Sequence, residues 1–182
     1  PLILSPATCC LGDLWLDTAD AAVLSLESAF SGRIELERVT IDQRALDVPA
    51  LQVAGGELLA TRCWLASGGA VSLSGGRLEL RQSTVRNQAE DDGGQNMTLY
   101  ASGGTLRLES CVIENVSPAG YAAYLDASTA DLRAWSCLFR KASASYAIHA
   151  AQAVAFPLAA CRGNGPLHPN LGGAHDYLYD SS

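Results

Sequence analysis

The chain has 182 residues, of which 48% are hydrophobic and 17% charged, with a formal net charge of −7. This composition fits one globular domain with a sizeable core rather than a disordered chain. The sequence has no basic run that would track phosphates, so nucleic acid is not expected as a partner. It also has no stretch of 18 apolar residues, so no membrane span is expected.

Residues 1–22 precede the first regular pattern. We expect them to form an N-terminal cap or an irregular first coil, and Cys9-Cys10 has no assigned role there. The chain begins at Pro1 rather than Met, which fits a processed protein or a domain cut from a larger one. An extracellular or cell-surface location would require a signal outside these residues.

Five segments between residues 23 and 164 share one outline: RIELERVTIDQ, ELLATRCWLAS, RLELRQSTVRN, TLRLESCVIEN and DLRAWSCLFRK. Alternating apolar residues in the first half of each segment are typical of a strand with one buried face. A small or apolar residue follows in the column Val39, Cys63, Ser83, Cys111 and Cys137, and a weaker sixth copy, FPLAACRGN, adds Cys161. The column recurs every 20 to 28 residues, which predicts a solenoid of stacked units.

A third short strand precedes each unit and often ends in a glycine pair, as at Gly55-Gly56, Gly75-Gly76 and Gly103-Gly104. Such pairs are typical of tight bends with positive φ. Together these features predict an all-β fold, a single-stranded right-handed parallel β-helix solenoid of about six to seven coils of three short strands. We expect this β-helix over residues 23–164 and a C-terminal cap or tail over 165–182.

The outline xLxLxxCxIxN…AxxLxGG resembles the repeat of right-handed, pectate-lyase-like parallel β-helices over most of the chain. In that family an inward asparagine ladder commonly fills the corner where this chain has cysteines. The resemblance implies the fold but no particular activity, because this architecture serves lyases, hydrolases, isomerases, adhesins and phage tail proteins alike.

The corner cysteines should stack, because neighbouring strands lie about 4.8 Å apart. The principal interpretation of Cys63, Cys111, Cys137 and Cys161 is a column of reduced thiols that pack as small hydrophobes. A disulfide between neighbouring coils is the alternative. A metal centre is disfavoured, because the thiols form a line and no histidine completes a tetrahedron.

In polysaccharide-active relatives, catalysis usually takes place on the outer face of the third-strand sheet. We assign two outward files to that face: Ser25, Gln52, Ser72, Tyr100 and Asp126 in one, and Ala50, Ala70, Thr98 and Tyr124, with His149 nearby, in the other. General acid–base chemistry needs two tuned groups, whereas these files contain one carboxylate and one histidine, so no catalytic residues are predicted. The candidates for a shallow glycan-binding surface are Tyr100, Tyr124, Asp126 and His149.

Two further segments contain potential metal ligands. The loop over residues 88–95 holds Glu90, Asp91 and Asp92, but three adjacent acids rarely converge on one cation. His168 and His175 lie in a Pro/Gly-rich tail, where such a pair is more often incidental. We therefore expect no metal and no cofactor, and the role of the acidic loop is open.

The strand after the cysteine corner carries an outward file of Thr40, Trp64, Thr84, Val112 and Leu138. A contiguous apolar stripe such as Trp64, Val112 and Leu138 is typical of a covered surface. The tails of this chain, a second subunit or partner protein could cover it, or it could be plainly exposed. Self-association through the stripe is therefore one prediction.

These observations favour a non-catalytic structural or recognition module of a larger protein that binds glycan or partner chains. The alternative is a polysaccharide-active enzyme, a lyase or glycoside hydrolase of the pectate-lyase-like superfamily, whose catalytic residues lie outside the motifs above.

Overall fold

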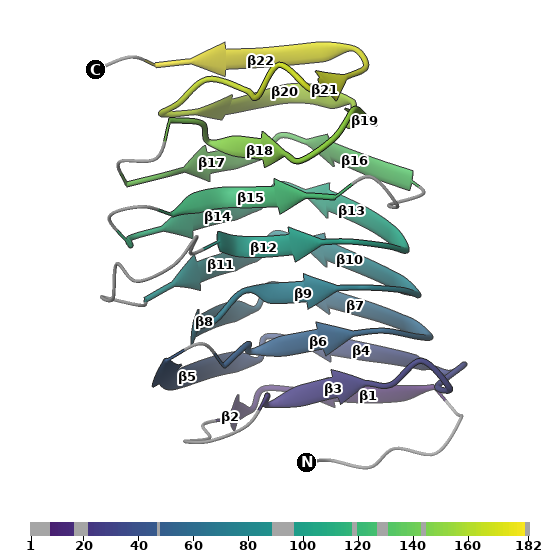
Figure 1. Cartoon of the computed structure of the whole chain (residues 1–182). Helices are drawn as coiled ribbons and strands as arrows, with labels where there is room; N and C mark the ends of the chain where they lie inside the picture. The colour runs from purple at the N-terminus through teal and green to yellow at the C-terminus, as the bar shows by residue number, and fades with distance from the viewer. Residues whose placement is uncertain are drawn as a thin grey trace.

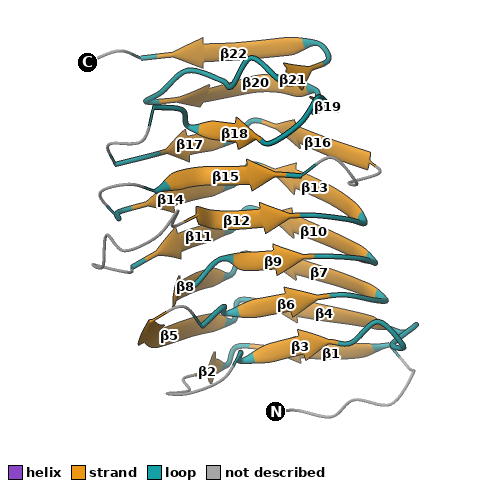
Figure 2. Ribbon diagram, in the orientation of Figure 1, coloured by secondary structure: helices purple, strands orange, loops and turns teal. Residues whose placement is uncertain are grey.

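The computed structural model describes residues 8–16, 22–46, 48–88, 97–117, 120–126, 131–142 and 145–180. Their strands wind into a right-handed parallel β-helix whose turns stack in a column, with the two ends of the chain at opposite ends of it (Figure 1). The described residues form strands and loops but no helix (Figure 2), and so no helix that could span a membrane. The all-β solenoid predicted from the repeat is confirmed.

Each complete turn contains three strands. The strands before the cysteine corner are β4 (Arg33–Glu37), β7 (Glu57–Thr61), β10 (Arg77–Arg81), β13 (Thr105–Glu109) and β16 (Asp131–Trp135). Those after it are β5 (Thr40–Leu46), β8 (Trp64–Gly68), β11 (Thr84–Asn87), β14 (Val112–Asn115) and β17 (Leu138–Arg140). The third strands are β3 (Leu24–Leu26), β6 (Leu51–Val53), β9 (Val71–Leu73), β12 (Met97–Ala101), β15 (Tyr121–Leu125) and β18 (Ile148–Ala150).

Incomplete turns extend the stack at both ends. At the N-terminal end β1 (Cys9–Gly12) pairs with β4 and β2 (Trp15–Leu16) pairs with β5. At the C-terminal end lie β19 (Val154–Ala155), β20 (Leu158–Gly163), β21 (Leu171–Gly172) and β22 (His175–Tyr179). The described residues therefore make five complete turns, slightly fewer than the six to seven coils expected. The domain boundaries at residues 22 and 164 stay predictions.

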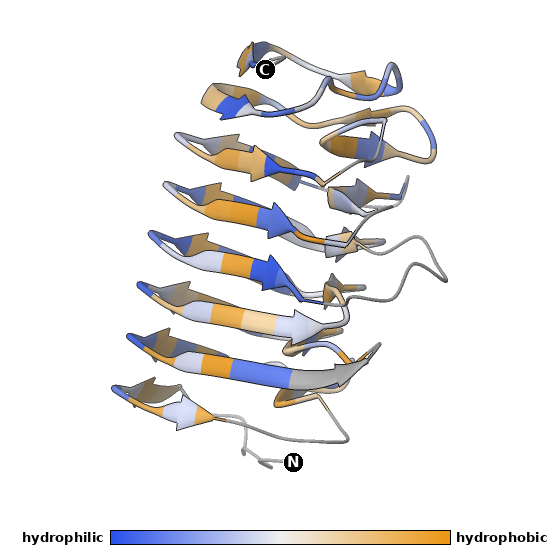
Figure 3. Ribbon diagram, turned by 90° about the vertical axis from the view of Figure 1, so that its left-hand side faces the viewer, coloured by the Kyte–Doolittle hydropathy of each residue, from blue (hydrophilic) through white to orange (hydrophobic). Residues whose placement is uncertain are grey.

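The core is built from the inward files that the repeat predicts. One such file pairs in unbroken register from β4 to β16 and is at most 2% exposed: Ile34, Leu58, Leu78, Leu106 and Leu132. Burying one leucine of this kind stabilises a fold by roughly 1.5–3 kcal/mol. Figure 3, which views the stack from the left-hand side of Figure 1, shows hydrophobic and hydrophilic residues alternating along the turns.

The first corner of each turn is made by a residue in the left-handed region of backbone space. Seven residues other than glycine have φ between 49° and 55° at these corners: Asp13, Arg38, Arg62, Gln82, Ser110, Ser136 and Ala160. In five of the seven corners the next residue is a buried cysteine or serine. All six cysteines are free, as the reduced-thiol interpretation predicts.

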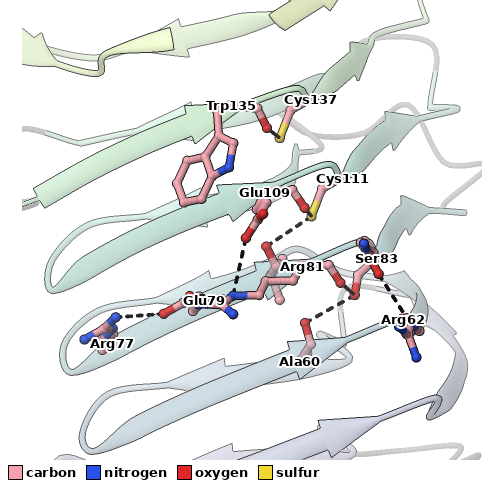
Figure 4. Close-up of polar contacts among 12 residues, drawn as sticks. Ala60, Arg62, Arg77, Glu79, Arg81, Ser83, Glu109, Cys111, Trp135 and Cys137 are labelled. Atoms are coloured by element: carbon pink, nitrogen blue, oxygen red, sulfur yellow. Dashed lines mark hydrogen bonds and ion pairs between the residues drawn. The ribbon is translucent and has the colours of Figure 1, made fainter. Parts of the chain in front are cut away.

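The corner side chains of Cys63, Ser83 and Cys111 hydrogen-bond to backbone carbonyls of their own turn and of the turn below, as Figure 4 shows for Ser83 and Cys111. The thiol of Cys111 donates to the carbonyl of Glu109 at 3.2 Å and to that of Leu80 at 3.3 Å. The hydroxyl of Ser83 donates to the carbonyl of Arg81 at 2.8 Å. A small side chain with a donor group therefore suits this corner, which explains why cysteine or serine occupies most of these positions.

The bends before β7, β10 and β13 use the glycine pairs as predicted. Gly56, Gly76 and Gly104 have φ of 63°, 66° and 75°, where residues with a side chain are strained. A Cβ atom on Gly104 would also lie 2.5 Å from the carbonyl oxygen of Gly76 in the turn below. These glycines let successive bends stack closely.

Two asparagines stack at the corner between the second and third strands. Asn87 and Asn115 pair in register and are 1% and 2% exposed. The amide of Asn87 donates to the carbonyl of Met97, and the amide of Asn115 donates to that of Tyr121, each at 3.0 Å. Each asparagine thus fixes the residue that begins the next third strand.

Candidate functional site

The register of the third-strand sheet corrects the two outward files assigned from the sequence. Tyr100 pairs with Tyr124, and Tyr124 pairs with His149, so one file runs Ser25, Gln52, Ser72, Tyr100, Tyr124 and His149. Asp126 is not in that file. Ala50 and Thr98, expected outside in a second file, are 0% and 1% exposed.

The error has a simple cause. The connection from Tyr124 to Asp131 is two residues longer than that from Tyr100 to Thr105, and it lacks the glycine pair. A constant spacing to the next strand therefore misplaces Tyr124 and Asp126 by two positions. Asp126 instead follows the end of β15, where its backbone N–H donates to the carbonyl of Ala101 at 2.8 Å.

The structure brings six rings together on this face, which we call the aromatic face: Tyr100, Tyr121, Tyr124, Tyr146, His149 and His168. All six are half-buried. Tyr100 and Tyr124 lie in neighbouring turns with ring centroids 5.9 Å apart. His149 stacks on Tyr124 at 4.8 Å with an interplanar angle of 17°.

The rings form two files because the turns that carry them bury two consecutive residues between two outward ones. In β15, Ala122 and Ala123 are buried between Tyr121 and Tyr124, and both of their N–H groups donate to the carbonyl of Ala147. The centroids of the two tyrosine rings consequently lie only 6.1 Å apart. Tyr146 and His149 repeat this spacing in the next turn.

Buried polar contacts of Asn115 hold Tyr121, the first residue of β15. The amide of Asn115 donates to the Tyr121 carbonyl, while its side-chain oxygen accepts the N–H of Ser117 at 2.8 Å. A Cβ atom on Gly120 would lie 2.1 Å from that oxygen, so only glycine fits beside the asparagine. The position of Tyr121 is therefore set by buried polar contacts.

The segment after β20 places His168 next to His149. The N–H of His168 donates to the carbonyl of Ile148 at 3.0 Å, and Asn170 donates from its side chain to the carbonyl of Ala150 at 3.1 Å. The two imidazole centroids are 4.3 Å apart. Tyr146 meets His168 edge-on at 4.7 Å and completes the upper end of the face.

The two histidines have different polar surroundings. Nδ1 of His168 accepts the N–H of Asn170 at 3.2 Å. Nδ1 of His149 is buried without a hydrogen-bond partner. Burial, and then the neighbouring charge of His168, lower the pKa of His149 below its usual value.

Sequence reasoning missed Tyr121, Tyr146 and His168. A signal was present, because Tyr121-x-x-Tyr124 and Tyr146-x-x-His149 repeat one spacing in consecutive turns. We assumed strict alternation along the third strand, which places residues three apart on opposite faces. The two consecutive buried residues break that alternation.

The stripe after the cysteine corner has the predicted register. Thr40, Trp64, Thr84, Val112 and Leu138 pair in sequence across β5 to β17. Trp64 is 41% exposed, and the other four are half-buried.

The remaining metal candidates find no support among the described residues, which contain no group of three or more side chains that could hold a metal ion. His175 does not join the aromatic rings; its Nε2 lies 3.2 Å from the carbonyl oxygen of Gly172. Glu90, Asp91 and Asp92 lie outside the described residues.

Comparison with family models, curated proteins and solved structures gave no match. The resemblance to pectate-lyase-like repeats therefore stands at the level of the β-helix fold. Function has to be inferred from the geometry of the surface.

Proposed function

We propose that the chain is a non-catalytic recognition module that binds an extended, neutral glycan along the aromatic face. The observation that carries this proposal is the double file of rings over consecutive turns. Tyrosine rings offer large apolar contact area with little side-chain entropy to lose, and their hydroxyl groups can hydrogen-bond to sugar.

The shape of the face favours a chain over a single sugar. Tyr100, Tyr124, His149 and His168 occupy four consecutive turns, so the face extends about 14 Å along the solenoid axis. Rings in a row on an exposed sheet suit a ligand that lies across several turns. A shallow surface desolvates little of each sugar, so the dissociation constant should be on the order of 10⁻³–10⁻⁴ M for a short oligosaccharide.

Charge favours a neutral glycan over a polyuronate. The outward file on this sheet contains serine, glutamine, tyrosine and histidine, and the neighbouring Asp126 is acidic. Burial lowers the pKa of His149, which disfavours its charged form, and the whole chain has a net charge of −7, which repels polyanions. A glycan rich in carboxylates would find no cation in this file.

A panel of soluble polysaccharides in affinity gel electrophoresis tests the proposal. We expect retardation by one or more neutral glycans and none by polygalacturonate. Tyr100→Ala and Tyr124→Ala should each remove the retardation without changing the melting temperature. Gln52→Ala, in the same file but below the rings, is the matched control and should be retarded like the wild type.

Release of reducing ends, or of unsaturated products, should be measured on the same panel with and without calcium. Turnover by the purified chain would overturn the non-catalytic assignment in favour of a polysaccharide-active enzyme. Retardation that survives both tyrosine substitutions would place the binding surface elsewhere.

A further inference from the structure

The apolar stripe continues past the five residues predicted from the repeat. Trp15 pairs with Thr40 at the N-terminal end, and Arg162 and then Leu178 continue the file after Leu138. Trp15 is 69% exposed and Leu178 is 68% exposed. The described strands at both ends therefore lengthen the stripe instead of covering it. Its eight positions extend about 34 Å along the solenoid.

A second file on the same sheet carries alternating charge. Arg86, Glu114 and Arg140 follow one another in neighbouring turns, two positions along the strands from the stripe. Glu114 lies 3.6 Å from Arg86 and 3.5 Å from Arg140. The guanidinium groups are only partly covered, so they can also pair with charges outside this chain.

We propose that this sheet is the interface of a two-fold symmetric dimer of the chain, with the two solenoid axes antiparallel. The two-fold axis would run along the strands, between Thr84 and Val112. Under this symmetry each outward file faces the same file of the second copy in reverse order. The inference concerns a different sheet from the aromatic face and goes beyond the proposed function.

The stripe matches itself under this operation. Trp15 would face Leu178 of the second copy, and Trp64 would face Leu138. The polar ends match as well, because Thr40 would face Arg162. Large apolar groups thus oppose large apolar groups, and the exposed arginine opposes a hydroxyl.

The charged file matches under the same operation. Arg86 of each copy would face Glu114 of the other, which creates two intermolecular ion pairs about the symmetry axis. A dimer with parallel axes would instead place Arg162 opposite Arg162, so like charges would meet. Both files therefore favour the antiparallel arrangement. Because the pattern on this sheet matches itself, we infer that a second copy of the chain covers it.

The interface is narrow, so the dimer should be weak. A stripe that is one residue wide, with one charged file beside it, falls at the low end of the areas seen in specific complexes, where association is transient. We expect a dissociation constant on the order of 10 μM, with dimerisation favoured by salt because each copy has a net charge of −7.

Sedimentation velocity of the full chain over a concentration series tests the dimer. The wild type should shift toward twice the monomer mass, and Trp64→Asp should stay monomeric at every concentration. Gln52→Asp is the control, because Gln52 is exposed on the third-strand sheet, and it should dimerise like the wild type. Circular dichroism checks that each variant is folded.

A charge-reversal pair then tests the arrangement. Arg86→Glu and Glu114→Arg should each weaken self-association at least tenfold, because like charges would meet twice across the axis. An equimolar mixture of the two variants should form heterodimers as tightly as the wild type does, although each chain still carries its own internal repulsion. A wild type that is monomeric at all concentrations overturns the dimer, and a mixture that fails to associate overturns the antiparallel arrangement.

Discussion

At the scale of single residues, the backbone geometry of the first corner of each turn limits which residue types fit there. The preceding residue has positive φ, and the side chain that follows points inward beside two carbonyl groups. Cysteine and serine fit because they are small and can donate a hydrogen bond. The recurrent cysteines are thus explained without a disulfide or a metal.

The thiols of this column should react slowly in the folded protein. Burial raises the pKa of Cys63, and contacts with the neighbouring thiols, followed by burial, raise that of Cys137. The hydrogen bond with Cys137 lowers the pKa of Cys161 to about 7, but Cys161 is only 2% exposed, so access limits its reaction.

A thiol reagent should therefore label Cys10, which is exposed, and the half-buried Cys9 in the native protein. The four corner cysteines should be labelled only after denaturation. Rapid native labelling of all six would contradict the burial of the corner, and missing thiols after denaturation would indicate disulfides.

At the scale of strands, period-two alternation determines which residues pack. Ile113 is fully buried and Val112, its neighbour in β14, faces outward and is half-buried. Ile113→Asp should lower the free energy of unfolding by about 3 kcal/mol or more, because an unpaired charge enters a dry core. Val112→Asp should cost far less.

Urea titration of both variants measures the difference. Since Val112 also lies in the proposed dimer interface, the comparison should be made at a concentration where the wild type is monomeric. Equal destabilisation by the two substitutions would mean that the register of β14 is misassigned.

The same strands show what could be predicted from sequence and what could not. The files through Leu58 and Cys111 were predictable because the corner between them has a constant length. The file through Tyr124 could not be placed from the spacing to the next strand, because the bend before β16 is longer than the glycine bends. The positive φ of residues such as Arg62 left no compositional signal, since arginine does not favour that conformation.

At the scale of the whole molecule, each turn is stabilised by the turns stacked on it. A change of protonation in one turn therefore affects the stability of the whole solenoid. His149 is the group whose protonation we expect to change the stability of the fold near neutral pH. Its pKa in the fold lies below the usual 6.5, so below about pH 6.5 the unfolded chain takes up a proton that the folded chain resists. This contribution to stability is fully present above that pH and is lost as the pH falls through the folded pKa.

Carboxylates act at lower pH and in the same direction. Burial opposes ionisation of Glu79, but hydrogen bonds from Arg77 and Arg81 outweigh it and lower its pKa (Figure 4). Asp131 has its pKa lowered by hydrogen bonds from Arg107 and Arg133. The stability that these two carboxylates contribute is lost only as the pH falls into the usual range of carboxylate pKa values. That range lies well below the pH range in which His149 acts.

The urea midpoint of the wild type should therefore fall between about pH 7.5 and about pH 5.5. His149→Phe keeps a ring stacked on Tyr124 but has no proton to gain, so its midpoint should fall less over the same range. If the urea midpoint of His149→Phe falls as far as that of the wild type, His149 is not the source of the pH dependence of stability.

The most direct test of glycan recognition is a two-dimensional NMR titration of the isotope-labelled chain with a neutral oligosaccharide from a glycan that the polysaccharide panel identifies. We expect the perturbed amides to cluster on β12, β15, β18 and residues 166–170, which carry the six rings. Perturbations centred on the strands that carry Trp64 or Glu79, or none at saturating sugar, would contradict the assignment of the aromatic face.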